Sequence, residues 1–150
     1  MSHDSIWARV FGPVPLEPVE FETLELRPTP NQHLVSPPGL TKASPHAAPP
    51  VFDAPVERLE HAFLQMVGRL RRVRRLASQL EKRQYNFEVL TPVLRFPDAI
   101  TVRFLPQDDG RSTLAIYSRS LYGRSDFGTN KRRVEEWLER LRKELAQKPA

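Results

Sequence analysis

The sequence predicts an α+β fold, a two-layer sandwich of about four antiparallel strands with two helices on one face. Two segments place apolar residues at helical spacing, and the chain between them changes to the alternation that is typical of strands. The 15 prolines are unevenly placed, with eleven of them in residues 1–55. We therefore expect a long proline-rich extended arm (1–52), a folded domain (53–146) and a short tail (147–150).

The first helix is expected within residues 53–70. Asp53 is the expected N-cap, and Pro55 lies in the first turn, where the N–H that proline lacks is not needed. Gly68 is the expected end of the helix. The apolar stripe of this helix has spacings of three and four and comprises Val56, Leu59, Phe63, Met66, Val67 and Leu70.

Four strands joined by short connections are expected to follow, and this order favours a meander. They cover residues 71–77, 83–90, 100–105 and 112–121. In the third strand the apolar residues from Ile100 onward are expected to face the helices, so that Thr101 and Arg103 face the other way. The stretch 19–26 of the arm also alternates and is a candidate edge strand.

The second helix is expected to run from Asp126 or Thr129 to Ala146. On its exposed side acidic residues precede basic residues by four positions, which stabilises a helix. Its buried stripe comprises Val134, Trp137, Leu138, Leu141 and Leu145.

A run of polar residues lies between the last strand and this helix, and it allows two interpretations. The run comprises Arg119, Arg124, Ser125, Asp126 and Asn130. In the structural interpretation, Asp126, Thr129 or Asn130 accepts hydrogen bonds from the first helical turn, and the two arginines pair with Asp126. In the functional interpretation, Arg119, Arg124 and Ser125 form an anion or ligand pocket with the helix amides.

The residue types exclude several classes of active site. The chain has no cysteine, which excludes thiolate chemistry, cysteine-bound zinc and iron–sulfur clusters. The four histidines are not spaced as metal ligands, and Ser125 has neither a neighbouring base nor a nucleophile elbow. We therefore expect no catalytic residue, no metal and no cofactor.

The positive charge belongs to the folded part of the chain. The net charge is +5, and residues 1–50 hold five acidic and three basic residues, so the remainder carries +7. This charge is concentrated in Arg69–Arg75 and Lys131–Arg133. Because no aromatic platform accompanies these runs, we expect no specific nucleic-acid binding and at most weak binding of anionic surfaces.

The N-terminus contains a short amphipathic segment, in which Ile6, Trp7, Val10 and Phe11 share one side of a helical turn. So short a segment needs a surface to fold against, and we expect a protein or membrane-associated partner. No secretory signal and no membrane-spanning run is visible in the sequence. The expected location is the cytoplasm, with a position at the membrane periphery as a variant.

Three motifs in the second half of the chain occur together in one family. They are an R-F-P-D strand entry (95–98), an S-R-S-x-x-G-x-S-D-x-G-x-N run (118–130) and an R-R-V helix start (132–134). In these motifs the sequence resembles the bacterial and plastid family catalogued as domain of unknown function 1499. The Pro-Asn pair at 30–31 resembles that family's N-terminal segment, which implies that the arm belongs to the domain. The resemblance implies membership and no activity.

Three functions remain open from the sequence. The first is a non-enzymatic binding or assembly module that engages its partner through the N-terminal arm. The second is a small-ligand-binding protein or enzyme with a polar pocket around Arg119, Ser125, Asp126 and Asn130. The third is a weak binder of anionic surfaces through Arg69–Arg75. If Asp126 and Asn130 are buried and bound to backbone amides, the second function loses its most favourable site residues.

Overall fold

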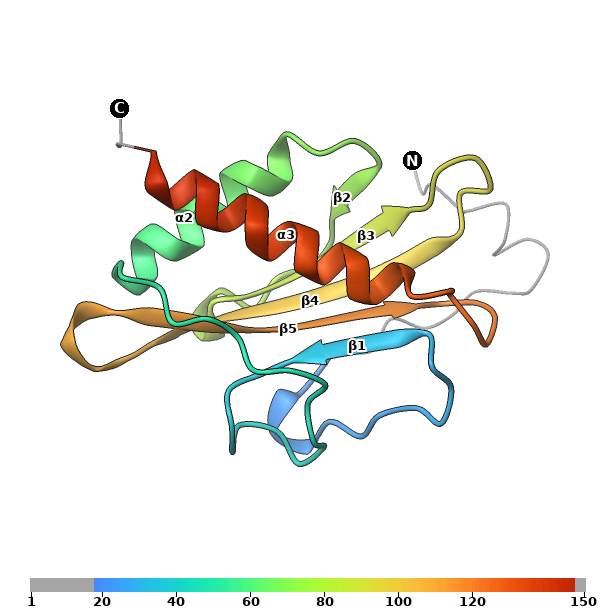
Figure 1. Ribbon diagram of the computed structural model, residues 1–150, viewed down its shortest axis with the longest axis horizontal. Coiled ribbons are helices and arrows are strands. Elements are labelled where there is room, and N and C mark those ends of the chain that lie inside the picture. The colour runs from blue at the N-terminus through green and yellow to red at the C-terminus, as the bar shows by residue number, and fades with distance from the viewer. Residues whose placement is uncertain (1–17, 148–150) are drawn as a thin grey trace.

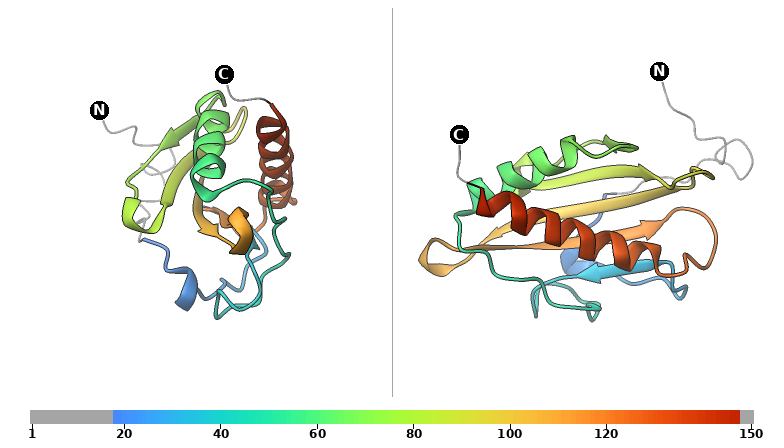
Figure 2. Two further views of the ribbon diagram at one scale, coloured as in Figure 1. Left: turned by 90° about the vertical axis from the view of Figure 1, so that its left-hand side faces the viewer. Right: turned by 45° about the horizontal axis from the view of Figure 1, so that its top comes forward.

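The computed structural model describes residues 18–147, and these form an α+β fold with two helices on one face of an antiparallel sheet (Figures 1 and 2). The predicted fold class is confirmed, with five strands where about four were expected. The strands are β1 (Gln32–Val35), β2 (Val73–Arg75), β3 (Gln84–Leu90), β4 (Pro97–Pro106) and β5 (Ser112–Ser120). The helices are α2 (Val56–Gly68) and α3 (Thr129–Ala146), and short 3-10 turns occur at Phe21–Thr23, Leu80–Lys82 and Asp108–Gly110.

The sheet order is β1-β5-β4-β3-β2, with antiparallel neighbours throughout. Strands β2 to β5 form the expected meander, because each pairs with the next along the chain. The additional strand, β1, comes from within the segment predicted as an extended arm and pairs with β5, with Leu34 opposite Tyr117. All four residues of β1 are buried, so the strand has no alternating pattern by which the sequence could reveal it.

Residues 19–26 do not form the expected edge strand. They contain the 3-10 turn Phe21–Thr23, and Val19 and Phe21 pack against the face of the sheet opposite the helices. Arg103, expected to point outward, is therefore buried beneath this segment, with its guanidinium 5.3 Å from the centre of the Phe21 ring. Arg103 donates to the side chain of Gln84 at 2.8 Å and forms an ion pair with Glu22.

The main core lies between the sheet and the two helices. Phe63 of α2 contacts Phe104 and Trp137 edge-to-face, with ring centroids 5.3 and 5.9 Å apart. The predicted stripes of both helices face this core, and the apolar residues of β4 face it as expected. The core therefore holds α2 and α3 on the same side of the sheet.

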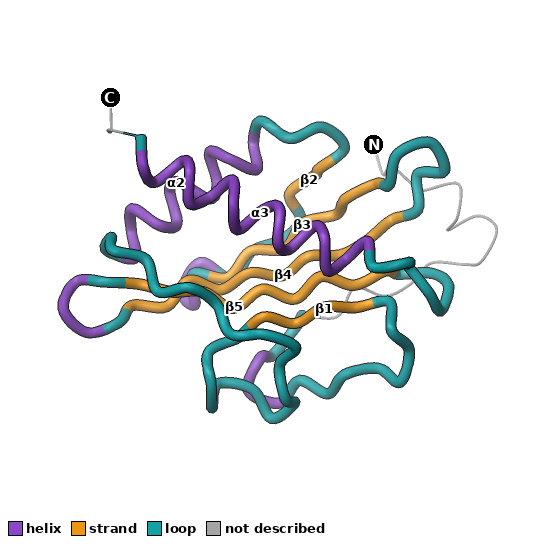
Figure 3. The backbone as a smooth tube through the Cα atoms, viewed as in Figure 1, coloured by secondary structure: helices purple, strands orange, loops and turns teal. Residues whose placement is uncertain are grey.

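The helix ends correct one prediction and confirm two. Asp53 does not cap α2, because Pro55 occupies the N-cap position and no side chain caps the first turn. The helix ends at Gly68 and α3 ends at Ala146, both as predicted. Figure 3 shows that an irregular connection leads from β1 to α2.

This connection folds back onto β1 through a pair of histidines. The backbone N–H of Leu34 donates to Nδ1 of His46 at 2.9 Å, and the N–H of His46 donates to the carbonyl of Leu34 at 2.8 Å. The rings of His33 and His46 are stacked with centroids 5.0 Å apart. Burial, and then the neighbouring His46, lowers the pKa of the His33 imidazole.

We expect the free energy of unfolding to decrease as the pH falls below about 6.5, the usual pKa of a histidine in an unfolded chain. In that range the unfolded chain binds the proton on His33 more readily than the folded chain, so stability is retained above it and lost below it. Urea unfolding at several pH values measures this slope. His33→Gln should reduce the slope, and an unchanged slope in His33→Gln would contradict the assignment.

Candidate functional site

Asp126, in the polar run after β5, caps the start of α3. Its carboxylate accepts from the backbone N–H of Gly128 at 2.9 Å and from that of Asn130 at 3.0 Å. The hydroxyl of Thr129 donates to the Asp126 carbonyl at 2.7 Å. Partial burial works to raise the pKa of Asp126, but the hydrogen bonds from Asn130 and Gly128 outweigh it and lower the pKa. Asp126 thus performs the capping role that the sequence predicted for this joint.

Asn130 is fully buried and is the centre of the joint between sheet and helix. Its side-chain oxygen accepts from the Ser118 hydroxyl at 2.6 Å and from Arg133 at 3.0 Å. Its amide nitrogen lies 2.9 Å from the Ser120 hydroxyl and 3.3 Å from the Asn31 carbonyl. The side chain of Asn130 therefore joins α3, β5 and the segment that enters β1.

Asp98 and Arg133 form a buried ion pair beside Asn130. The carboxylate of Asp98 lies 2.7 Å from the Arg133 guanidinium, and the two side chains are only 2% and 9% exposed. Burial raises the pKa of Asp98, while the charge of Arg133 opposes that rise. The pair was not predicted from the sequence, although alternation along β4 directs Asp98 to the same face as the core-facing residues of that strand. Asp98 stands opposite Ser120 in the sheet.

Arg119 does not contact Asp126, because alternation along β5 directs it to the opposite face of the sheet. There it donates to the Thr101 hydroxyl at 3.2 Å and lies 4.9 Å from the centre of the Tyr117 ring. Burial lowers the pKa of Arg119 to about 10. Arg124 and Ser125 are exposed. The five residues of the polar run therefore do not converge on one pocket.

A cleft of about 380 Å³ brings the two basic runs of the sequence together. It lies between residues 129–140 of α3 and the segment that leads from α2 through β2, with the end of β3 beside it. Its apolar lining residues include Leu70, Val73, Val89 and Trp137. Its ionisable lining residues are Arg71, Arg72, Arg132, Arg133, Arg140 and Glu136.

Three of these guanidinium groups have no carboxylate partner among the described residues. Arg133 is paired with Asp98, and Arg140 donates to Glu136 at 2.9 Å. Arg72 and Arg132 donate to backbone carbonyls, at 3.2 Å to Leu90 and at 2.9 Å to Phe127, and are otherwise exposed. Arg71 is also exposed and belongs to no ion pair in the described chain. The cleft therefore has a surplus of positive charge.

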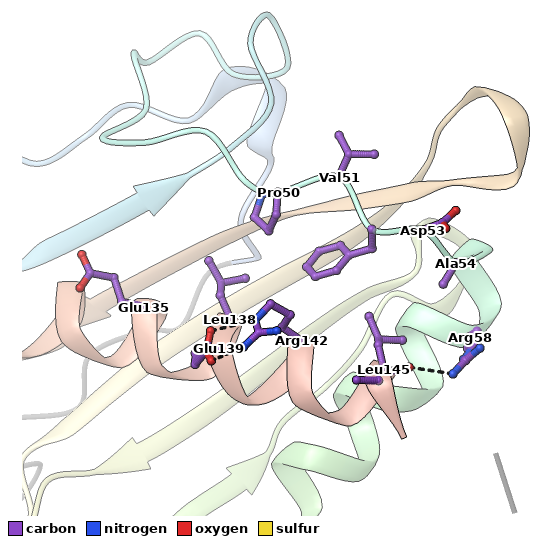
Figure 4. A pocket seen from close by; sticks show the side chains of 12 residues that line it. Pro50, Val51, Asp53, Ala54, Arg58, Glu135, Leu138, Glu139, Arg142 and Leu145 are labelled. Atoms are coloured by element: carbon purple, nitrogen blue, oxygen red, sulfur yellow. Dashed lines mark hydrogen bonds and ion pairs between the residues drawn. The ribbon is translucent and has the colours of Figure 1, made fainter. Parts of the chain in front are cut away.

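A second concavity, of about 560 Å³, lies between α3 and the segment 50–54 (Figure 4). Its charges are nearly balanced, because Arg58 and Arg142 face three acidic residues, namely Asp53, Glu135 and Glu139. Arg58 donates to the Leu145 carbonyl at 2.8 Å, and Arg142 to Glu139 at 2.6 Å, as Figure 4 shows. This groove offers no charge to a ligand comparable to that of the arginine cleft.

The predicted docking residues Ile6, Trp7, Val10 and Phe11 lie outside the described residues, and their role stays a prediction. Within residues 18–147, no group of three or more histidine or acidic side chains is placed to hold a metal ion. No helix in this part of the chain has the length and apolar character needed to cross a bilayer.

Asp126→Ala should lower the free energy of unfolding by about 1–2 kcal/mol, because the backbone amides of Gly128 and Asn130 at the start of α3 lose their acceptor. Asp53→Ala is the matched control: Asp53 was predicted to cap α2 but does not, so its loss should change stability by less than about 0.5 kcal/mol. Urea denaturation of both variants measures the difference. Equal losses would show that the Asp126 cap contributes nothing specific.

Comparison with known proteins places the chain in one family. No curated protein matches the sequence of this chain. The profile of the family described as "Protein of unknown function (DUF1499)" matches residues 13–141, which is most of the chain and includes the joint and the arginine cleft. The chain therefore belongs to the DUF1499 family.

Proposed function

We propose that this chain is a non-enzymatic binding module and that its ligand is a multiply charged anion held in the arginine cleft. The observation that carries the proposal is the convergence of five arginines and one glutamate on a single concavity. Two of the arginines are neutralised, by Asp98 and by Glu136, and three are not. An anion with several charged oxygens would supply the missing partners.

The chemistry of the lining residues supports binding. Arginine presents a planar set of donors that matches phosphate or carboxylate oxygens, and it stays protonated at any physiological pH. Among the described lining residues the only carboxylate is that of Glu136, which is already engaged by Arg140. The volume of about 380 Å³ falls in the range of small-ligand sites.

The cleft supports a small or local anionic group better than an extended nucleic acid. Trp137, the aromatic residue of the lining, is buried at 4% exposure and offers no face on which a base could stack. The sequence predicted a weak binder of anionic surfaces through Arg69–Arg75. The proposed site adds Arg132 of α3, which lines the same cleft as Arg71 and Arg72.

We expect the full chain to bind inorganic pyrophosphate in isothermal titration calorimetry, with an affinity that decreases as salt is added. Arg71→Gln combined with Arg132→Gln should weaken binding at least about tenfold, because charge-assisted hydrogen bonds to the ligand are lost. Both side chains are exposed, so the variant should unfold at the same urea concentration as the wild type.

The control is Arg111→Gln, which removes one positive charge, where the cleft variant removes two, from an exposed arginine in the β4–β5 hairpin at the opposite end of the sheet. It should leave the pyrophosphate affinity within about twofold of wild type, since distant exposed charges are largely screened. An equal loss in the control, or no loss in the cleft variant, would overturn the proposal.

A further inference from the structure

Large apolar side chains are exposed at one end of the sheet. The two most exposed in the described chain are Val93 at 94% and Phe127 at 88%. Val93 belongs to the β3–β4 turn (91–96), where Leu94 is also 59% exposed, and Phe127 belongs to the β5–α3 connection (121–128). Exposed apolar groups that gather on one surface mark an interaction site more often than scattered single ones.

The two loops are neighbours in space. The β3–β4 turn and the β5–α3 connection project from the same end of the molecule in both Figure 1 and Figure 2. The strand register requires this, because Asp98 stands opposite Ser120 and the N–H of Leu121 donates to the Pro97 carbonyl at 3.2 Å. The apolar tips therefore belong to one surface.

The backbone at both tips does not favour these residues. Val93 has φ +66° and Phe127 has φ +52°, in the left-handed region where glycine or asparagine is more easily accommodated. The turns themselves are closed by other groups: the N–H of Thr91 donates to Phe96, and Asp126 accepts from Gly128. Neither tip side chain is needed to form its turn, so the exposed apolar groups call for another explanation.

The arginine cleft borders both tips. Pro92, next to Val93, lines the cleft from one side, and Thr129 and Arg132 line it from the other. Arg132 also donates to the carbonyl of Phe127 at 2.9 Å. Arg95 and Arg124 are exposed in the same two loops. The loops that carry the apolar tips thus border a cationic cleft and carry exposed arginines themselves.

We infer that this end of the molecule docks on the surface of an anionic lipid bilayer, with Val93 and Phe127 entering the interface and the arginine cleft receiving lipid phosphate groups. The inference rests on the proposed function and names the source of the anion. Apolar insertion and attraction to anionic lipid are each weak alone, and peripheral binding takes both together. Here both are present on one surface.

The test is co-sedimentation of the full chain with vesicles of phosphatidylcholine alone or of an equimolar mixture with phosphatidylglycerol. We expect binding to the mixed vesicles only. Val93→Ser with Phe127→Ser should weaken this binding at least about tenfold and leave pyrophosphate affinity unchanged, because it removes insertion and keeps the cleft. A second variant, Val93→Gly with Phe127→Gly, relaxes the backbone at both tips and should behave alike.

The matched control is Val51→Ser with Leu80→Ser, which removes two other exposed apolar side chains, 52% and 63% exposed, outside this surface. It should bind mixed vesicles as the wild type does. Arg71→Gln with Arg132→Gln should lose both vesicle and pyrophosphate binding. The inference would be overturned if the tip variants bound mixed vesicles at the wild-type level. This includes the case in which the binding is purely electrostatic and is lost when salt is added.

The two proposals fail in different ways. Pyrophosphate binding without vesicle binding would overturn the membrane inference and leave the anion site standing. Vesicle binding that depends on the tips, without pyrophosphate binding, would overturn the anion site as proposed and retain docking through the tips. Tip-dependent binding to duplex DNA or polyglutamate in place of vesicles would also overturn the membrane inference.

Discussion

The buried ion pair between Asp98 and Arg133 ties α3 to the start of β4. Both charges are withdrawn from water, so each needs the other, and removal of one partner from such a pair costs about 3–5 kcal/mol. The side chain of Asn130 strengthens the same joint, because it forms hydrogen bonds with Ser118, Ser120 and Arg133. Together these side chains fix where α3 begins and which of its faces meets the sheet.

The orientation of α3 determines the cleft. Consecutive residues of a helix lie about 100° apart, so turning Arg133 inward places Arg132 on an adjoining face. Arg132, Glu136 and Arg140 follow at intervals of four and line the cleft as a stripe. The same joint ends in the loop that exposes Phe127. The joint formed by Asp98, Asn130 and Arg133 therefore positions both the arginines of α3 in the cleft and the apolar tip at Phe127.

The second face of the sheet depends on residues 18–52. Asn31 reaches the joint directly, since its side chain donates to the Gly123 carbonyl at 2.7 Å and its carbonyl accepts from Ser120 at 3.0 Å. Farther along, Gln84 donates to the Val19 carbonyl at 2.7 Å and holds Arg103 beneath Phe21. The segment that was predicted as an extended arm thus completes the fold, as the resemblance at Pro30 and Asn31 implied.

Local patterns predicted the parts of the fold that are locally determined. Alternation identified β3 to β5, helical spacing identified α2 and α3, and Asp126 was recognised as a cap because capping acts within a few residues. Strand β1 could not be predicted, since its partner Tyr117 lies 83 positions from Leu34 and its burial does not alternate. The position of Arg119 was predictable from alternation, because Ser118 and Ser120 take the other face.

The cleft was visible in the sequence only as two separate basic runs. Their convergence depends on how α3 crosses the sheet, which no local pattern encodes. A nuclear magnetic resonance titration of the full chain with inorganic pyrophosphate would show whether the two basic runs form one site. We predict saturable shifts at Arg71, Arg72 and Arg132. Shifts confined to Arg119 and Tyr117, or to the groove at residues 50–54, with the cleft unchanged, would contradict it.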